Sequence, residues 1–162
     1  MTVLSITLTA AGAAALLNIW IAMRIGTLRR QHGILFGDGG NPQLLARMRA
    51  QSNFVEYAPF FLILLALIEL ARGQSLWLWL ATSLFILGRI LHVFGMDRPT
   101  VNPLRGAGIG LSMLTLVGLA IWAIAIPYLH RDRAPAINYT AQSPAQAPDS
   151  TLSATNGLVR RS

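Results

Sequence analysis

Residues 47–61 decide the fold, and they read RMRAQSNFVEYAPFF. The stretch opens a strongly apolar segment, yet it carries an arginine, an asparagine and a glutamate. On a helix, Arg49, Asn53 and Glu56 stand at positions i, i+4 and i+7, which places their side chains along one stripe. A carboxylate at the start of an apolar run is expensive to desolvate and normally has a partner. The stripe is therefore a candidate binding surface.

The composition of the whole chain indicates an integral membrane protein. Of the 162 residues, 54% are hydrophobic and only 12% are charged, whereas soluble domains carry about 25% charged residues. The apolar residues gather into four runs, each long enough to cross the roughly 30 Å of hydrocarbon in a bilayer. We predict an all-α, up-down bundle of four transmembrane helices in residues 1–130. Residues 131–162, rich in Pro, Ala, Ser and Thr, are predicted to be a disordered tail.

Charge and cysteine content narrow the possible functions. The formal net charge is +7, and every one of the 13 basic residues is arginine. Basic loops of membrane proteins report the orientation of the protein and attract anionic lipid headgroups. Nucleic-acid binding is not indicated, because the sequence contains no soluble module rich in basic and aromatic residues. The chain has no cysteine, so a thiolate nucleophile or a cysteine metal site is excluded, and its three histidines lack metal-ligand spacing. We expect neither a metal nor a nucleic-acid partner.

The apolar runs set the expected spans. The first covers Val3–Met23, the third Leu76–Met96, and the fourth begins near Leu104 or Gly106 and ends near Leu129. The second helix is expected to run from Pro42 to about Leu70, with only the part from about Phe54 in the hydrocarbon. Asn41 followed by Pro42 is typical of a helix start.

Three further features accompany these spans. Residues 24–43 are expected to form a polar loop, and Glu69 is expected to reach water at the end of the second span. The glycines within residues 106–110 indicate either close helix contact or a bend at a helix start.

The arginines orient the bundle. Five of them fall in the first loop and its flanks and two near the third loop, whereas the second loop holds one and the amino terminus none. The positive-inside rule then places loops 1 and 3 in the cytoplasm and both termini outside.

Antiparallel helices bring Glu56 and Arg89 to a similar depth, so the sequence predicts an ion pair between them. Arg49, Asn53, His92 and Arg105 map to the same cytoplasmic end. One interpretation is that these charges only pair and fix the packing of the helices. The other is a bound anion, because Arg49, Arg89 and Arg105 outnumber the single carboxylate.

Two motifs carry a family resemblance. The first motif is residues 49–60, RAQSNFVEYAPF, and the second is residues 88–92, GRILH, followed by Arg105. Both resemble signatures of the MAPEG family, which comprises membrane-associated proteins in eicosanoid and glutathione metabolism. The resemblance covers residues 1–129. Residues 37–40, GDGG, further resemble a branch of the family found in bacterial inner membranes.

The resemblance implies a homotrimer that holds glutathione between subunits near the cytoplasmic face. It implies that Arg49, Asn53 and Glu56 bind the polar ends of glutathione, that Arg89 braces Glu56 and that His92 lines the pocket. Arg105 is implied as the catalytic residue nearest the sulfur. A free thiol has a pKa of about 8.5, and nearby arginines lower it.

The implied activity is a glutathione transferase or peroxidase in which the thiolate attacks a small hydrophobic electrophile from the bilayer. Two positions depart from the family pattern. Gly106 replaces a serine, and Met96 replaces a tyrosine of its prostaglandin E synthase, so neither side chain donates a hydrogen bond to sulfur. The alternative function is a non-catalytic membrane protein whose polar stripe binds a lipid headgroup or stabilises the oligomer.

Overall fold

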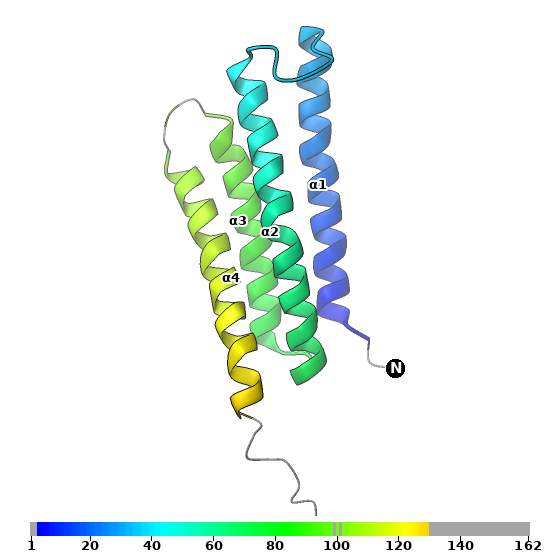
Figure 1. The fold of residues 1–162 in the computed structure, drawn as a ribbon, viewed down its shortest axis with the longest axis vertical. Helices are drawn as coiled ribbons and strands as arrows, with labels where there is room; N and C mark the ends of the chain where they lie inside the picture. Colours follow the sequence, from blue (N-terminus) through cyan, green and yellow to red (C-terminus); the bar gives the residue numbers. More distant parts are fainter. Residues whose placement is uncertain (1–2, 99, 101, 130–162) are drawn as a thin grey trace, which may run out of the picture. The chain divides into compact units, whose positions relative to one another are not determined.

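The computed structural model describes residues 3–98, 100 and 102–129, which form a bundle of long helices (Figure 1). The helices are α1 (Ser5–His32), α2 (Pro42–Arg72), α3 (Leu76–Met96) and α4 (Pro103–Leu129). All four are long and apolar enough to cross a membrane, which confirms the predicted all-helical membrane fold. The predicted tail, residues 131–162, lies outside the described residues.

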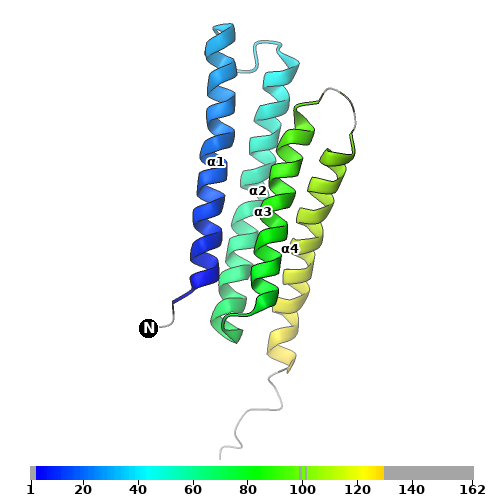
Figure 2. The same ribbon diagram turned by 180° about the vertical axis from the view of Figure 1, so that it is seen from behind.

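The helices run up and down in alternation, so the loops α1–α2 and α3–α4 lie at the same end (Figures 1 and 2). We call this the arginine-rich end, because the arginines of both loops and their flanks gather there, and we call the other the opposite end. At the arginine-rich end, α1 and α2 project beyond α3 and α4 (Figure 2).

Helix α1 is longer than the sequence predicts. It ends at His32, nine residues after the expected end at Met23, so Arg24 lies within a helix and not in a loop. The prediction was wrong because it equated the edge of the apolar run with the end of the helix. Ile25 and Leu28 continue the buried stripe, and the helix stops only at Gly33, whose φ of 64° is left-handed. At 28 residues, α1 is about 42 Å long and exceeds the hydrocarbon thickness.

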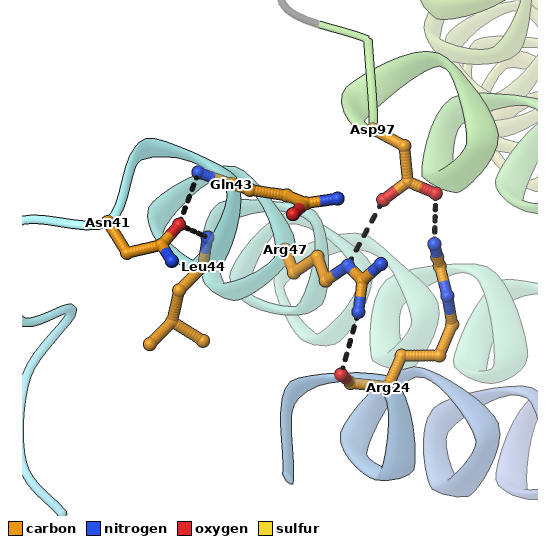
Figure 3. A network of polar contacts seen from close by, with 6 residues as sticks. All are labelled: Arg24, Asn41, Gln43, Leu44, Arg47 and Asp97. Carbon is orange, nitrogen blue, oxygen red and sulfur yellow. Dashed lines mark hydrogen bonds and ion pairs between the residues drawn. The ribbon is translucent and has the colours of Figure 1, made fainter. Parts of the chain in front are cut away.

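The predicted start of α2 is confirmed. Oδ1 of Asn41 accepts hydrogen bonds from the backbone N–H groups of Gln43 (2.9 Å) and Leu44 (3.1 Å), and Pro42 is the first helical residue. Figure 3 shows this cap. Pro59 lies inside the helix, which continues to Arg72.

Helices α3 and α4 approach most closely through glycines. A Cβ on Gly108 would lie 2.4 Å from the backbone nitrogen of His92, and one on Gly88 would lie 2.7 Å from the Ser112 hydroxyl. Within the glycine run at 106–110, close helix contact is therefore found at Gly108 alone, since nothing lies within 4 Å of a Cβ on Gly106 or Gly110. The alternative of a bend at the helix start is wrong, because α4 already starts at Pro103. Towards the opposite end, the same two helices line an open apolar cavity of about 590 Å³.

Glu69 departs from its expected exposure. It is 3% exposed, and its carboxylate accepts hydrogen bonds from the backbone N–H groups of Ile6 (3.0 Å) and Thr7 (2.8 Å) and from the Thr7 hydroxyl (2.7 Å). The residue before α1, Leu4, offers no side-chain cap. A carboxylate from α2 therefore caps the first turn of α1, where a helix favours negative charge.

Candidate functional site

The two sequence motifs meet between α2 and α3. Nη1 of Arg89 donates to Oδ1 of Asn53 at 2.6 Å and to its carbonyl oxygen at 3.4 Å. The Arg89 side chain is 1% exposed, and its guanidinium lies 5.0 Å from the ring centre of Tyr57 and 5.2 Å from that of Phe85. A buried arginine is thus held by an amide and two aromatic faces.

The predicted ion pair between Glu56 and Arg89 is wrong for this chain. Glu56 is exposed, and the ion pairs among the described residues all involve Asp97. The helix explains the difference, since Asn53 and Tyr57 are one turn apart on the face towards Arg89. Glu56 is rotated by about 60° from Asn53 around the axis. The amide and the ring therefore take the contacts that were assigned to the carboxylate.

Arg49 and Arg105, from α2 and α4, line one open cavity of about 510 Å³ at the arginine-rich end, which we call the polar cavity. Its described lining is Pro42, Gln43, Leu45, Ala46, Arg49, Met96, Asp97, Arg98 and Arg105. The side chains of Arg49, Arg98 and Arg105 have no ion pair or hydrogen bond with any described residue. Three guanidinium groups that face a cavity without acidic partners are an arrangement suited to an anion.

A charged cluster that the sequence did not reveal adjoins this cavity through Asp97. Asp97 accepts from Arg24 through Oδ2 and from Nε of Arg47 through Oδ1 at 3.3 Å, and Arg47 also donates to the Arg24 carbonyl at 2.9 Å (Figure 3). The Arg24 guanidinium lies 4.8 Å from the Trp20 ring centre. We call Arg24, Arg47 and Asp97 the Asp97 cluster. It ties α1, α2 and the end of α3 together.

Sequence reasoning missed the cluster because Arg24 and Asp97 were both assigned to loops. The available signal was a count of charges, since Asp97 is the one acid near the end of the third span. Arg98, which lines the polar cavity, was missed for the same reason.

His92 is buried between α3 and α4, at 4% exposure. Its ring lies near the backbone of Arg105, and its Nδ1 has no hydrogen-bond partner among the described residues. The six predicted residues therefore divide into a cavity pair (Arg49, Arg105), a hydrogen-bonded pair (half-buried Asn53 and buried Arg89), buried His92, and an exposed Glu56. Within the described ranges, no three His, Asp or Glu side chains are grouped as a metal site would require.

Comparison with known proteins identifies the family of this chain. The model of the MAPEG family matches residues 7–125, which include both motifs and all six predicted residues. The chain belongs to the MAPEG family. The family resemblance drawn from residues 49–60 and 88–92 is thereby confirmed.

The MAPEG chain is also similar to a bacterial inner membrane protein. It is 28% identical over 82 residues to the inner membrane protein YecN of Escherichia coli strain K12, and equally to that of strain O6:H1. The similarity covers 51% of this chain and 63% of the length of YecN. The MAPEG chain is thus an integral, multi-pass membrane protein with a relative in a bacterial inner membrane, while its orientation stays a prediction.

The two positions that depart from the family pattern have different surroundings in this MAPEG chain. Met96 is buried and lines the polar cavity. Gly106 has nothing within 4 Å of a Cβ built on it. Among the described residues that line the polar cavity, Gln43 and the three arginines carry side-chain N–H donors.

Proposed function

We propose that this MAPEG protein binds glutathione, or a similar anionic thiol, at its arginine-rich end and transfers the thiol to hydrophobic electrophiles. The observation that carries the proposal is the polar cavity, in which Arg49, Arg98 and Arg105 lack acidic partners among the described residues. A guanidinium presents paired donors that match a carboxylate, and several of them favour an anion over a neutral ligand.

The chemistry assigned to the site is activation of a thiol. Arg105 would stand nearest the sulfur and favour its thiolate form, because a neighbouring positive charge lowers the pKa of a thiol. The thiolate would attack an electrophilic carbon of an apolar substrate, so that a carbon–sulfur bond forms and a leaving group departs with its electron pair. In the peroxidase variant, the thiolate would attack the terminal oxygen of a hydroperoxide, so that an S–O bond forms while the O–O bond breaks. The alkoxide leaves and is protonated to the alcohol, and a second molecule of the thiol converts the sulfenic acid to a disulfide and water.

A homotrimer would complete this site. Glu56 lies on an exposed face of α2 although it belongs to a membrane span, and a carboxylate there needs a partner. We propose that a neighbouring subunit covers Glu56 and Arg49, so that Glu56 meets the amino group of glutathione. Asn53 and Arg89 would position this part of α2 through their hydrogen bond.

Calorimetry tests the binding step. Glutathione is titrated into the full-length protein in nanodiscs, beside the Arg49→Gln variant and an Arg30→Gln control. Arg30 is an exposed arginine of the same end whose side chain donates to Thr27 at 3.4 Å and does not line the cavity. Binding that is weakened in Arg49→Gln and unchanged in Arg30→Gln supports the proposal. Absence of heat from the parent protein favours the alternative of a non-catalytic protein that binds a lipid headgroup.

Ultraviolet absorbance of bound thiolate at neutral pH tests the catalytic step. The Arg105→Gln variant is expected to lower this absorbance, because the positive charge nearest the sulfur is removed. Glutathione that binds but stays protonated in the parent protein would contradict the transferase mechanism while leaving the binding proposal intact.

A further inference from the structure

Asp97 is the one acidic residue among the described residues that line the polar cavity. A free carboxylate on this wall would repel an anionic ligand. Both of its oxygens, however, are engaged by arginines: Oδ2 by Arg24, and Oδ1 by Nε of Arg47 at 3.3 Å. The Asp97 cluster thus carries two positive charges and one negative charge.

The two arginines of the cluster stand apart from the cavity lining. Arg24 and Arg47 do not line the polar cavity, whereas Asp97 does. Figure 3 shows the Asp97 carboxylate facing both guanidinium groups, which come from α1 and α2. Arg47 is fixed further by the Arg24 carbonyl at 2.9 Å. Asp97 therefore holds two guanidinium groups that a ligand would otherwise attract.

We propose that Asp97 is a specificity-determining residue, an internal counter-anion that limits the negative charge of the ligand accepted by the polar cavity. This inference rests on the proposed function, because it requires the cavity to bind an anionic thiol. With Asp97 present, the ligand is bound by Arg49, Arg98 and Arg105, and the cavity favours a small thiol of low net charge. Without the Asp97 charge, Arg24 and Arg47 add their attraction and more highly charged anions gain most.

A purely structural role for Asp97 makes a different prediction. The cluster joins three helices, so its loss would weaken the fold and reduce the binding of every ligand by a similar factor. A role in selection changes the ratio between the affinities of two ligands that differ by one carboxylate group. The ratio of the two dissociation constants is thus the informative measurement, because a general loss of stability cancels from it.

The experiment compares Asp97→Asn with the parent protein, full length and in nanodiscs. Calorimetry measures the Kd of S-methylglutathione and of S-carboxymethylglutathione, which carries one additional carboxylate. Asp97→Asn is expected to shift the ratio about tenfold towards the second ligand, since one more net positive charge then acts on the added carboxylate at short range. The matched control is Asp38→Asn, which removes an acid from the same end whose carboxylate accepts from Gly40 N–H at 3.3 Å, outside the cavity lining.

The outcomes separate the two proposals. If the parent protein binds both ligands and Asp97→Asn leaves their ratio unchanged, or if Asp38→Asn shifts it equally, the role of Asp97 is wrong and the proposed function stands. If the parent protein binds neither ligand, the proposed function fails and charge selection fails with it.

An opposite substitution covers the case in which Asp97→Asn does not fold. Arg47→Gln keeps the Asp97 carboxylate but removes one of its two cations. The ratio is then expected to move several-fold away from S-carboxymethylglutathione. An unchanged ratio in Arg47→Gln would also overturn the inference, because Asp97 would then not govern the charge of the cavity.

Discussion

Each end of the bundle holds an acid that bonds to a neighbouring helix, and the two acids differ in their partners. At the opposite end, Glu69 receives three hydrogen bonds from the first turn of α1, and the nearby cavity between α3 and α4 is apolar. At the arginine-rich end, Asp97 is matched by two arginines, and three more face an open cavity. A carboxylate surrounded by donors completes a fold, whereas an excess of unpaired donors leaves capacity for a ligand.

The largest expected effect is a loss of stability at the opposite end. Glu69→Ala removes the acceptor of three donors from α1, and we expect the free energy of unfolding to fall by about 4 kcal/mol because those donors lose a charged partner. Denaturant titration of the protein in detergent measures the change. Leu70→Ala is the control, since this neighbouring side chain is 56% exposed. Equal losses in both variants would mean that Glu69 is not a structural cap.

The second prediction concerns the packing that holds α4 in place at the arginine-rich end. Gly108→Ala would bring a methyl group to 2.4 Å from the His92 backbone nitrogen, and backbone atoms cannot move aside cheaply. The expected loss in the free energy of unfolding is about 3 kcal/mol. Gly110→Ala is the matched control, because nothing lies within 4 Å of its added Cβ. Similar thermal unfolding of the two alanine variants would contradict the close approach of α3 and α4.

The helices of the bundle were predictable from the sequence, whereas the contacts of Glu69 and Asp97 were not. Apolar runs and the Asn41–Pro42 pair are local signals, and they predicted α2, α3 and α4 to within a few residues. The role of Glu69 depends on a helix start more than 60 residues away, so no local pattern contains it. The same limit applies to Asp97, whose partner Arg24 lies in the part of α1 that was assigned to a loop.

Within the candidate site, the sequence predicted depth better than direction. Asn53 and Arg89 do meet, at 2.6 Å, because antiparallel helices bring their levels together. Glu56 does not meet Arg89, because a step of three residues turns the side chain by about 60° from that of Asn53. Periodicity groups residues into a stripe, but the packing of the neighbouring helix decides which members of the stripe touch it.

The third prediction sharpens the assignment of ligand binding to the arginine-rich end. Arg49→Gln is expected to weaken glutathione binding about tenfold, which corresponds to about 1.4 kcal/mol, because one carboxylate contact loses its charge. The thermal stability should change little, since Arg49 is exposed and has no partner among the described residues. Calorimetry gives the Kd and scanning fluorimetry the stability. If the variant loses thermal stability but keeps its affinity for glutathione, Arg49 stabilises the fold and does not bind the ligand.

The smallest effect tests whether the opposite end depends on every donor to Glu69. Thr7→Val keeps the side-chain shape but removes the hydroxyl that donates to the carboxylate at 2.7 Å. Because two backbone N–H groups remain bonded to Glu69, we expect a loss of only about 1 kcal/mol in the free energy of unfolding. Thr9→Val is the control, as the exposed Thr9 hydroxyl donates to the Ser5 carbonyl in its own helix. If Thr7→Val costs as much as Glu69→Ala, the hydroxyl alone holds the carboxylate, and Glu69 acts as a side-chain clamp and not as a cap of the α1 backbone.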